Sequence, residues 1–141
     1  MDIDLQLLLI SPTADFAEAL GAVAPDGVEI SHARRPGQAV RRFDQAPPDL
    51  VLLTLDARPE QTALLIQALR ERPLGALVPM FLVDRQPGGA AHPLRTPEGA
   101  DEAGVERLFT AEDTPEVVLR AVAEHLGLEG WPQEAPTPSE P

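Results

Sequence analysis

The sequence predicts an α/β fold built on a doubly wound, five-stranded parallel sheet. Short apolar runs without alternation, of which Leu50–Leu53 is the clearest, are typical of strands that helices cover on both faces. These runs alternate along the chain with segments in which apolar residues recur every three or four positions, as in amphipathic helices. The alternation occurs five times, and right-handed crossovers between the strands then favour the sheet order 2-1-3-4-5.

Composition bounds the organisation of the chain and excludes several classes of partner. The 141 residues suit one domain, which we assign to residues 1–128, followed by a Pro- and Glu-rich disordered tail or linker at residues 129–141. A net charge of −12 disfavours binding to nucleic acid or to an anionic membrane surface, because both attract basic proteins. All eleven basic residues are arginine and there is no cysteine, so no site can use a lysine or a thiolate.

The first residues carry no secretory or membrane signal. Asp2 and Asp4 occupy positions where a signal peptide carries positive charge. The apolar run Leu5–Ile10 is too short to span a bilayer. We therefore expect a cytoplasmic protein.

The first two strands are predicted at Leu5–Ile10 and Val28–His32, the second at an edge of the sheet because its residues alternate. Each is followed by a helix with a proline near its start, Pro12 or Pro36. Ser11 or Thr13 is expected to cap the first of these helices. The residues predicted to face inward are Phe16, Leu20, Val23, Ala39, Val40 and Phe43, and those predicted to face solvent are Arg35, Arg41 and Arg42.

Two further strands are predicted at residues 48–56 and 76–83, because each contains a continuous apolar run. The helix between them is expected to begin near Pro59. Its inward-facing residues are predicted to be Ala63, Leu64, Ile66 and Leu69, and its polar residues Gln67, Arg70 and Glu71.

The fourth helix is predicted to be degraded. Residues 84–99 contain three prolines and three glycines, which leave room only for a short helical piece near residues 98–103. The fifth strand is predicted at Val105–Phe109, and a last helix should follow with Thr114 as its cap and Pro115 as its first residue. Its apolar stripe is predicted to be Val117, Val118, Ala121, Val122 and Leu126.

Three local patterns, in this order, resemble the receiver domain of bacterial response regulators. They are Pro48–Leu55, which resembles the stretch leading to the phosphoacceptor, Val78–Val83 with its leading proline, and the helix start at Thr114–Val118. The resemblance covers roughly residues 5–126. It implies a flavodoxin-like sheet and a role in two-component signal transduction.

The resemblance also implies where a receiver would carry its phosphorylation chemistry. The acidic pair that binds Mg²⁺ falls at Ser11 and Pro12, the phosphoacceptor aspartate at Thr54, the phosphate-contacting hydroxyl at Asp84, and the lysine at Ala111. None of these five positions carries the residue that the family's chemistry uses. We therefore expect a non-phosphorylatable pseudo-receiver, which is not an enzyme, needs no cofactor and acts by docking to protein.

The expected partner is another protein or a second copy of the chain, and a further domain is expected after the tail. In receivers, the face built from the fourth helix, fifth strand and last helix is the usual docking and dimerisation surface. The residues that would lie on or near that face here are Arg107, Glu112, Glu116 and Arg120.

Three alternatives remain open at this point. Asp56 and Asp84 could form a two-carboxylate cation site, but we favour the interpretation that both are solvated loop acids. The pairs Arg34–Arg35 and Arg41–Arg42 could dock an acidic partner, although solvated surface is the simpler interpretation. A small-ligand or nucleotide-sensing domain that uses the C-terminal ends of the strands is the alternative function.

Overall fold

A computed structural model of the chain describes residues 5–25, 27–55, 58–85 and 91–127. It contains a five-stranded parallel sheet of order β2-β1-β3-β4-β5, which confirms the predicted topology. The strands are β1 (Leu5–Ile10), β2 (Val28–Ala33), β3 (Leu50–Leu55), β4 (Met80–Asp84) and β5 (Arg107–Thr110). The helices are α1 (Asp15–Val23), α2 (Pro36–Gln45), α3 (Pro59–Arg70), α4 (Pro97–Glu102) and α5 (Pro115–Leu126), with a 3₁₀ turn, η1, at Pro93–Arg95.

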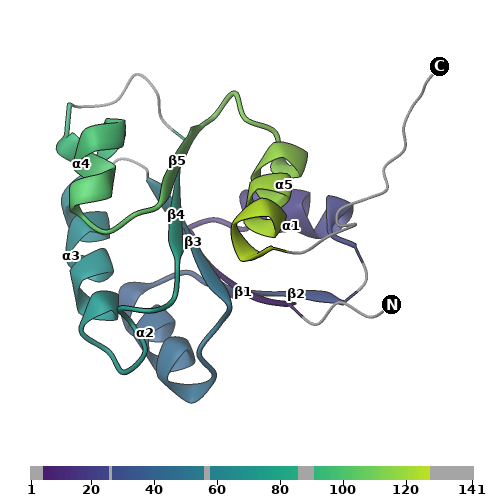
Figure 1. The fold of residues 1–141 in the computed structure, drawn as a ribbon, viewed down its shortest axis with the longest axis horizontal. Coiled ribbons are helices and arrows are strands. Elements are labelled where there is room, and N and C mark those ends of the chain that lie inside the picture. Colours follow the sequence, from purple (N-terminus) through teal and green to yellow (C-terminus); the bar gives the residue numbers. More distant parts are fainter. Residues whose placement is uncertain (1–4, 26, 56–57, 86–90, 128–141) are drawn as a thin grey trace.

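The sheet is the middle layer of three (Figure 1). Helices α2, α3 and α4 cover one face, and α1 and α5 cover the other. Alternate residues of each strand enter the two cores, so that Leu53 of β3 packs with Phe43 of α2, whereas Leu52 packs on the side of Leu20 of α1. Every residue of β3 is buried, as expected for the central strand of a doubly wound sheet.

Helix ends agree with the sequence at α5 and differ at α1. The Thr114 hydroxyl caps α5 by accepting the N–H of Val117, and Pro115 is the first helical residue. Helix α1 instead begins after Ala14 without a side-chain cap, because the Thr13 hydroxyl donates to the carboxylate of Asp15. The predicted capping role of Ser11 or Thr13 is therefore wrong.

The predicted inward faces of α3 and α5 each need one correction. Leu64 is 66% exposed, and its neighbour Leu65 is buried in its place. The prediction failed here because the unbroken apolar run Ala63–Ile66 does not reveal which residue faces the sheet. Val117 in the first turn of α5 is 39% exposed, although the predicted Val118 is buried. Strand β4 begins at Met80, later than predicted, and includes Asp84.

The segment after β4 confirms the degraded fourth helix. In its described part, η1 and the six-residue α4 lie over the same core as α2 and α3, with Leu94 and Ala100 buried. The Thr96 hydroxyl caps α4 by accepting the N–H of Gly99. Within the described ranges, no helix is long and apolar enough to cross a bilayer.

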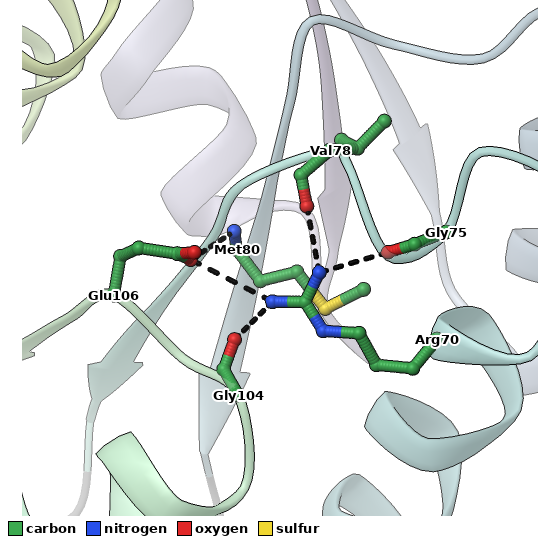
Figure 2. Close-up of polar contacts among 6 residues, drawn as sticks. All are labelled: Arg70, Gly75, Val78, Met80, Gly104 and Glu106. Atoms are coloured by element: carbon green, nitrogen blue, oxygen red, sulfur yellow. Dashed lines mark hydrogen bonds and ion pairs between the residues drawn. The ribbon is translucent and has the colours of Figure 1, made fainter.

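Arg70, predicted to be on the polar face of α3, turns instead toward the amino end of β4 (Figure 2). Its guanidinium donates to the backbone carbonyls of Gly75 at 2.8 Å, of Val78 at 2.9 Å and of Gly104. Glu106 lies 3.6 Å from the guanidinium and accepts the N–H of Met80 at 2.9 Å. One side chain therefore joins the end of α3 to the loops before β4 and β5.

Gly104 is required for this arrangement. Its φ of 97° lies in the left-handed region, which favours glycine. A Cβ at this position would lie 2.9 Å from Nε of Arg70, so any side chain would press on the guanidinium. The loop between α4 and β5 is thus shaped around the arginine.

We predict that Arg70→Met lowers the free energy of unfolding by about 3 kcal/mol, because it removes hydrogen bonds from partly buried carbonyls. Urea denaturation followed by circular dichroism measures the loss. Arg72→Met is the matched control, because the Arg72 side chain forms an exposed ion pair with Asp44, and exposed pairs contribute little to stability. Equal losses in the two variants would contradict the structural role given to Arg70.

Candidate functional site at the carboxyl edge of the sheet

The carboxyl ends of the parallel strands bring most of the predicted site residues to one edge of the sheet. Ser11 directly follows β1, Thr54 is the second-last residue of β3, Asp84 ends β4 and Ala111 follows β5. The strand register pairs Thr54 with Val83 and Leu55 with Asp84. This edge is where ligands bind in open α/β sheets.

Strand alternation separates two of these side chains. Thr54 continues the side of β3 that carries Leu52, in the core under α1 and α5. Asp84 continues the side of β4 that carries Leu82, in the core under α2, α3 and α4. Thr54 and Asp84 therefore leave their strands toward opposite faces of the sheet.

Thr54 and Ser11 are both buried, whereas Pro12 is exposed. The Thr54 hydroxyl donates to the carbonyl oxygen of Ile10 at 3.4 Å, a long hydrogen bond that directs its proton toward β1. The carbonyl oxygen of Ser11 lies 2.9 Å from Nε2 of His32, which holds the turn after β1 against β2. These contacts tie the first three strands together at their carboxyl ends.

Asp84 forms a buried ion pair with Arg95 of η1. Nη1 of Arg95 lies 2.5 Å from Oδ1 of Asp84, and the two side chains are only 10% and 8% exposed. The prediction that Asp84 is a solvated loop acid is therefore wrong. Burial of this carboxylate is tolerated because a guanidinium compensates its charge.

A second ion pair lies on the other face of the sheet. Arg85 is 3.4 Å from the Asp15 carboxylate, and its guanidinium lies over the ring of Phe16 at 5.0 Å from the centroid. The Thr13 hydroxyl, and to a lesser degree Arg85, hold the pKa of Asp15 below its ordinary value, so this exposed carboxylate is ionised at neutral pH.

Asp15 and Arg85 border a small hollow of about 270 Å³ between α1 and the start of α5. Thr110 and Asp113 belong to its wall, and Asp113 accepts the backbone N–H of Thr110 at 2.9 Å. Ala111 also lines the hollow, with a methyl group where the receiver resemblance expects a lysine.

The hypothesis of a cation site at Asp56 and Asp84 has only one of its residues in the described part of the chain. Asp56 lies outside the described residues. Asp84 already pairs with Arg95. Among the described residues there is no group of three or more acidic or histidine side chains that could hold a metal ion.

Sequence reasoning missed Arg95 and Arg85, the two arginines that organise this edge. Both follow β4 in a stretch whose prolines and glycines obscured any structural role. An aspartate at the end of a buried strand was the available signal, because burial of a carboxylate requires a nearby cation.

The predicted docking residues lie on the edge strand β5 and on α5. Arg107 is exposed on β5, and its guanidinium lies 5.2 Å from the centroid of the Phe109 ring. Glu116 and Arg120 are exposed one helical turn apart on α5, and Glu112 is exposed in the turn before it. The exposed Val117 adds an apolar side chain to the same end of α5.

Solved structures of receiver domains have this fold, although no protein-family model and no curated protein matches the sequence. The receiver domain of a signal transduction histidine kinase from Syntrophus aciditrophicus superposes with a TM-score of 0.66 at 20% identity, over 95% of this chain and 97% of that chain. The fold is that of a receiver domain.

Two further structures lead to the same result. A chemotaxis response regulator of Vibrio cholerae gives a TM-score of 0.70 at 13% identity, over 86% of this chain and 98% of that chain. A response regulator from Desulfuromonas acetoxidans gives 0.67 at 15% identity, over 89% and 98%. Sequence identities this low establish the receiver-like fold and leave the chemistry to be argued from this chain's own residues.

We predict that Arg95→Met alone lowers the free energy of unfolding by about 3–5 kcal/mol, because it removes the guanidinium that compensates the charge of the buried Asp84 carboxylate. Asp84→Leu alone should also lower the free energy of unfolding, because it removes the carboxylate that the mostly buried Arg95 guanidinium pairs with. The double variant Asp84→Leu/Arg95→Met should regain most of the stability, since an apolar pair replaces both charges. Urea denaturation of the three variants measures the coupling, and additive losses would contradict the ion pair.

Proposed function

We propose that this chain is a pseudo-receiver: a receiver-like module of a bacterial signalling or regulatory protein that docks to protein without accepting a phosphoryl group. The observation that carries the proposal is Thr54, which stands where the receiver resemblance expects the phosphoacceptor aspartate. Its hydroxyl is buried and bonded to the Ile10 carbonyl. A threonine hydroxyl is a poor nucleophile at neutral pH without an adjacent base.

The neighbouring positions support the same conclusion. Ser11 and Pro12 offer no carboxylate for Mg²⁺, which prefers anionic oxygen ligands. Asp84 is a carboxylate where the receiver resemblance expects a phosphate-contacting hydroxyl, and it is paired with Arg95. Ala111 has no cationic side chain, and the chain contains no lysine that could take its place.

The docking part of the proposal rests on the surface formed by β5 and α5. It combines the exposed charges of Arg107, Glu116 and Arg120 with the exposed methyl groups of Val117. Mixed charge around an apolar side chain suits recognition of a protein partner, or of a second copy of the chain. Because Asp84 and Arg95 hold η1 to the sheet, the neighbouring α4 would present one fixed conformation to that partner.

A phosphodonor experiment tests the proposal. Incubation with acetyl phosphate and Mg²⁺ should leave the intact mass unchanged, and beryllofluoride with Mg²⁺ should leave the amide chemical shifts unchanged, because the acceptor carboxylate is missing. A phosphorylatable receiver treated in parallel is the positive control. A phosphorylated mass, or beryllofluoride shifts clustered around Ser11, Thr54 and Ala111, would refute the proposal.

A small-ligand sensor is the second candidate, favoured by the hollow beside Asp15 and Arg85. The Asp15 carboxylate and the Arg85 guanidinium at this hollow could together orient a small zwitterionic molecule. At about 270 Å³ the hollow is smaller than the roughly 300–1,000 Å³ typical of small-molecule sites, which makes a nucleotide a poor fit. Mass spectrometry of the denatured protein would reveal a co-purified ligand and so separate this candidate from the first.

A further inference from the structure

Three arginines form an exposed basic surface at the start of α2. Arg34, Arg35 and Arg41, together with Gly37 and Gln38, line an open hollow of about 460 Å³. All three arginines are exposed. We call these five residues the arginine surface.

The arginine surface is a local exception in an acidic protein. Residues 30–43 contain four of the eleven arginines and no aspartate or glutamate, although the chain as a whole has a net charge of −12. The positive charge is therefore concentrated in one short segment and is not neutralised within it. Such clustering of like charge favours a locally positive potential on a chain that is acidic as a whole.

The contacts around these arginines hold the backbone and leave the guanidinium groups exposed. The backbone N–H of Arg34 donates to Oε1 of Gln38 at 2.9 Å, which fixes the entry into α2. Arg42, on the neighbouring side of the helix, donates to the Ser31 hydroxyl at 2.7 Å and so anchors α2 to β2. Among the ion pairs between described residues, none includes Arg34, Arg35 or Arg41.

The helix itself adds to the positive potential. The first turn of α2 contains no acidic residue, and no side chain caps its N-terminus. The partial positive charge of the helix end is therefore not offset by the protein's own carboxylates. The three guanidinium groups and the N-terminus of α2 therefore both favour the binding of a negatively charged group.

We propose that the arginine surface docks an acidic, carboxylate-rich segment of a partner protein. Guanidinium groups bind carboxylates through two parallel hydrogen bonds, and three of them around one hollow suit a short run of aspartate or glutamate. A long polyanion such as a nucleic acid would extend beyond the basic segment and meet the acidic remainder of the chain.

This site is separate from the surface proposed for receiver-type docking. Helix α2 lies on the opposite face of the sheet from α5 (Figure 1). The inference therefore does not depend on whether Thr54 accepts a phosphoryl group, and the two proposals can fail independently.

Binding of a fluorescein-labelled decaglutamate peptide, followed by fluorescence anisotropy at low ionic strength, tests the inference. The wild-type chain should bind, and the affinity should fall as salt is added. The triple variant Arg34→Ala/Arg35→Ala/Arg41→Ala should bind at least about tenfold more weakly, because it removes the charge-assisted hydrogen bonds. Amide shifts caused by the peptide should cluster at residues 34–41.

Arg72→Ala is the control for simple loss of charge, because Arg72 is an exposed arginine that pairs with Asp44 and does not belong to the arginine surface. It should change the affinity much less than Arg41→Ala. The inference would be overturned if the wild-type chain did not bind the peptide at low ionic strength, or if the triple variant bound it as tightly as the wild-type chain. It would also be overturned if Arg72→Ala weakened binding as much as Arg41→Ala. Tighter binding of a single-stranded oligothymidine with the same number of charges would overturn it in favour of a phosphate-bearing ligand.

Discussion

The buried ion pair between Asp84 and Arg95 is the constraint on which the carboxyl edge of the sheet depends. The described part of the segment after β4 contains only a 3₁₀ turn and a six-residue helix, which is too short to be stable through helix propensity. Its attachment rests on Leu94, Ala100 and the Arg95 guanidinium. Because a buried carboxylate is strongly destabilising without its cation, the ion pair favours the observed position of η1 and α4. Such a fixed position suits the static docking module that we propose.

An arginine also joins separate segments at the opposite end of β4. There Arg70 donates hydrogen bonds to three backbone carbonyls and forms an ion pair with Glu106. The planar guanidinium carries five donors and keeps its charge at all relevant pH values, so it can satisfy several loop carbonyls at once. The lysine-free chain thus uses the partly buried Arg70 and Arg95 to hold α3 and α4 in place. The exposed arginines at the start of α2 have no such partners among the described residues and are the ones proposed to bind.

The sheet order and the positions of the helices could be predicted because local signals agree there. Continuous apolar runs marked the buried strands, and Thr114 with Pro115 marked the start of α5. One position on the buried face of α3 was mispredicted, Leu64 in place of Leu65, since the run from Ala63 to Ile66 fits more than one helical face. The roles of Arg70 and Arg95 depend on groups distant in sequence, such as the Gly104 carbonyl. Asp84 was misassigned because β4 extends one residue beyond the predicted end.

The Asp84–Arg95 ion pair holds η1, and with it the neighbouring α4, against the sheet. Amide hydrogen exchange tests it most directly, at the N–H groups of Thr96 and Ala100, which are bonded to Pro93 and Thr96. Both should exchange slowly in the wild-type chain and much faster in Asp84→Asn, while β1 and β3 keep their protection. Unchanged exchange at these two amides in the variant would contradict the role of the ion pair in holding η1 and α4.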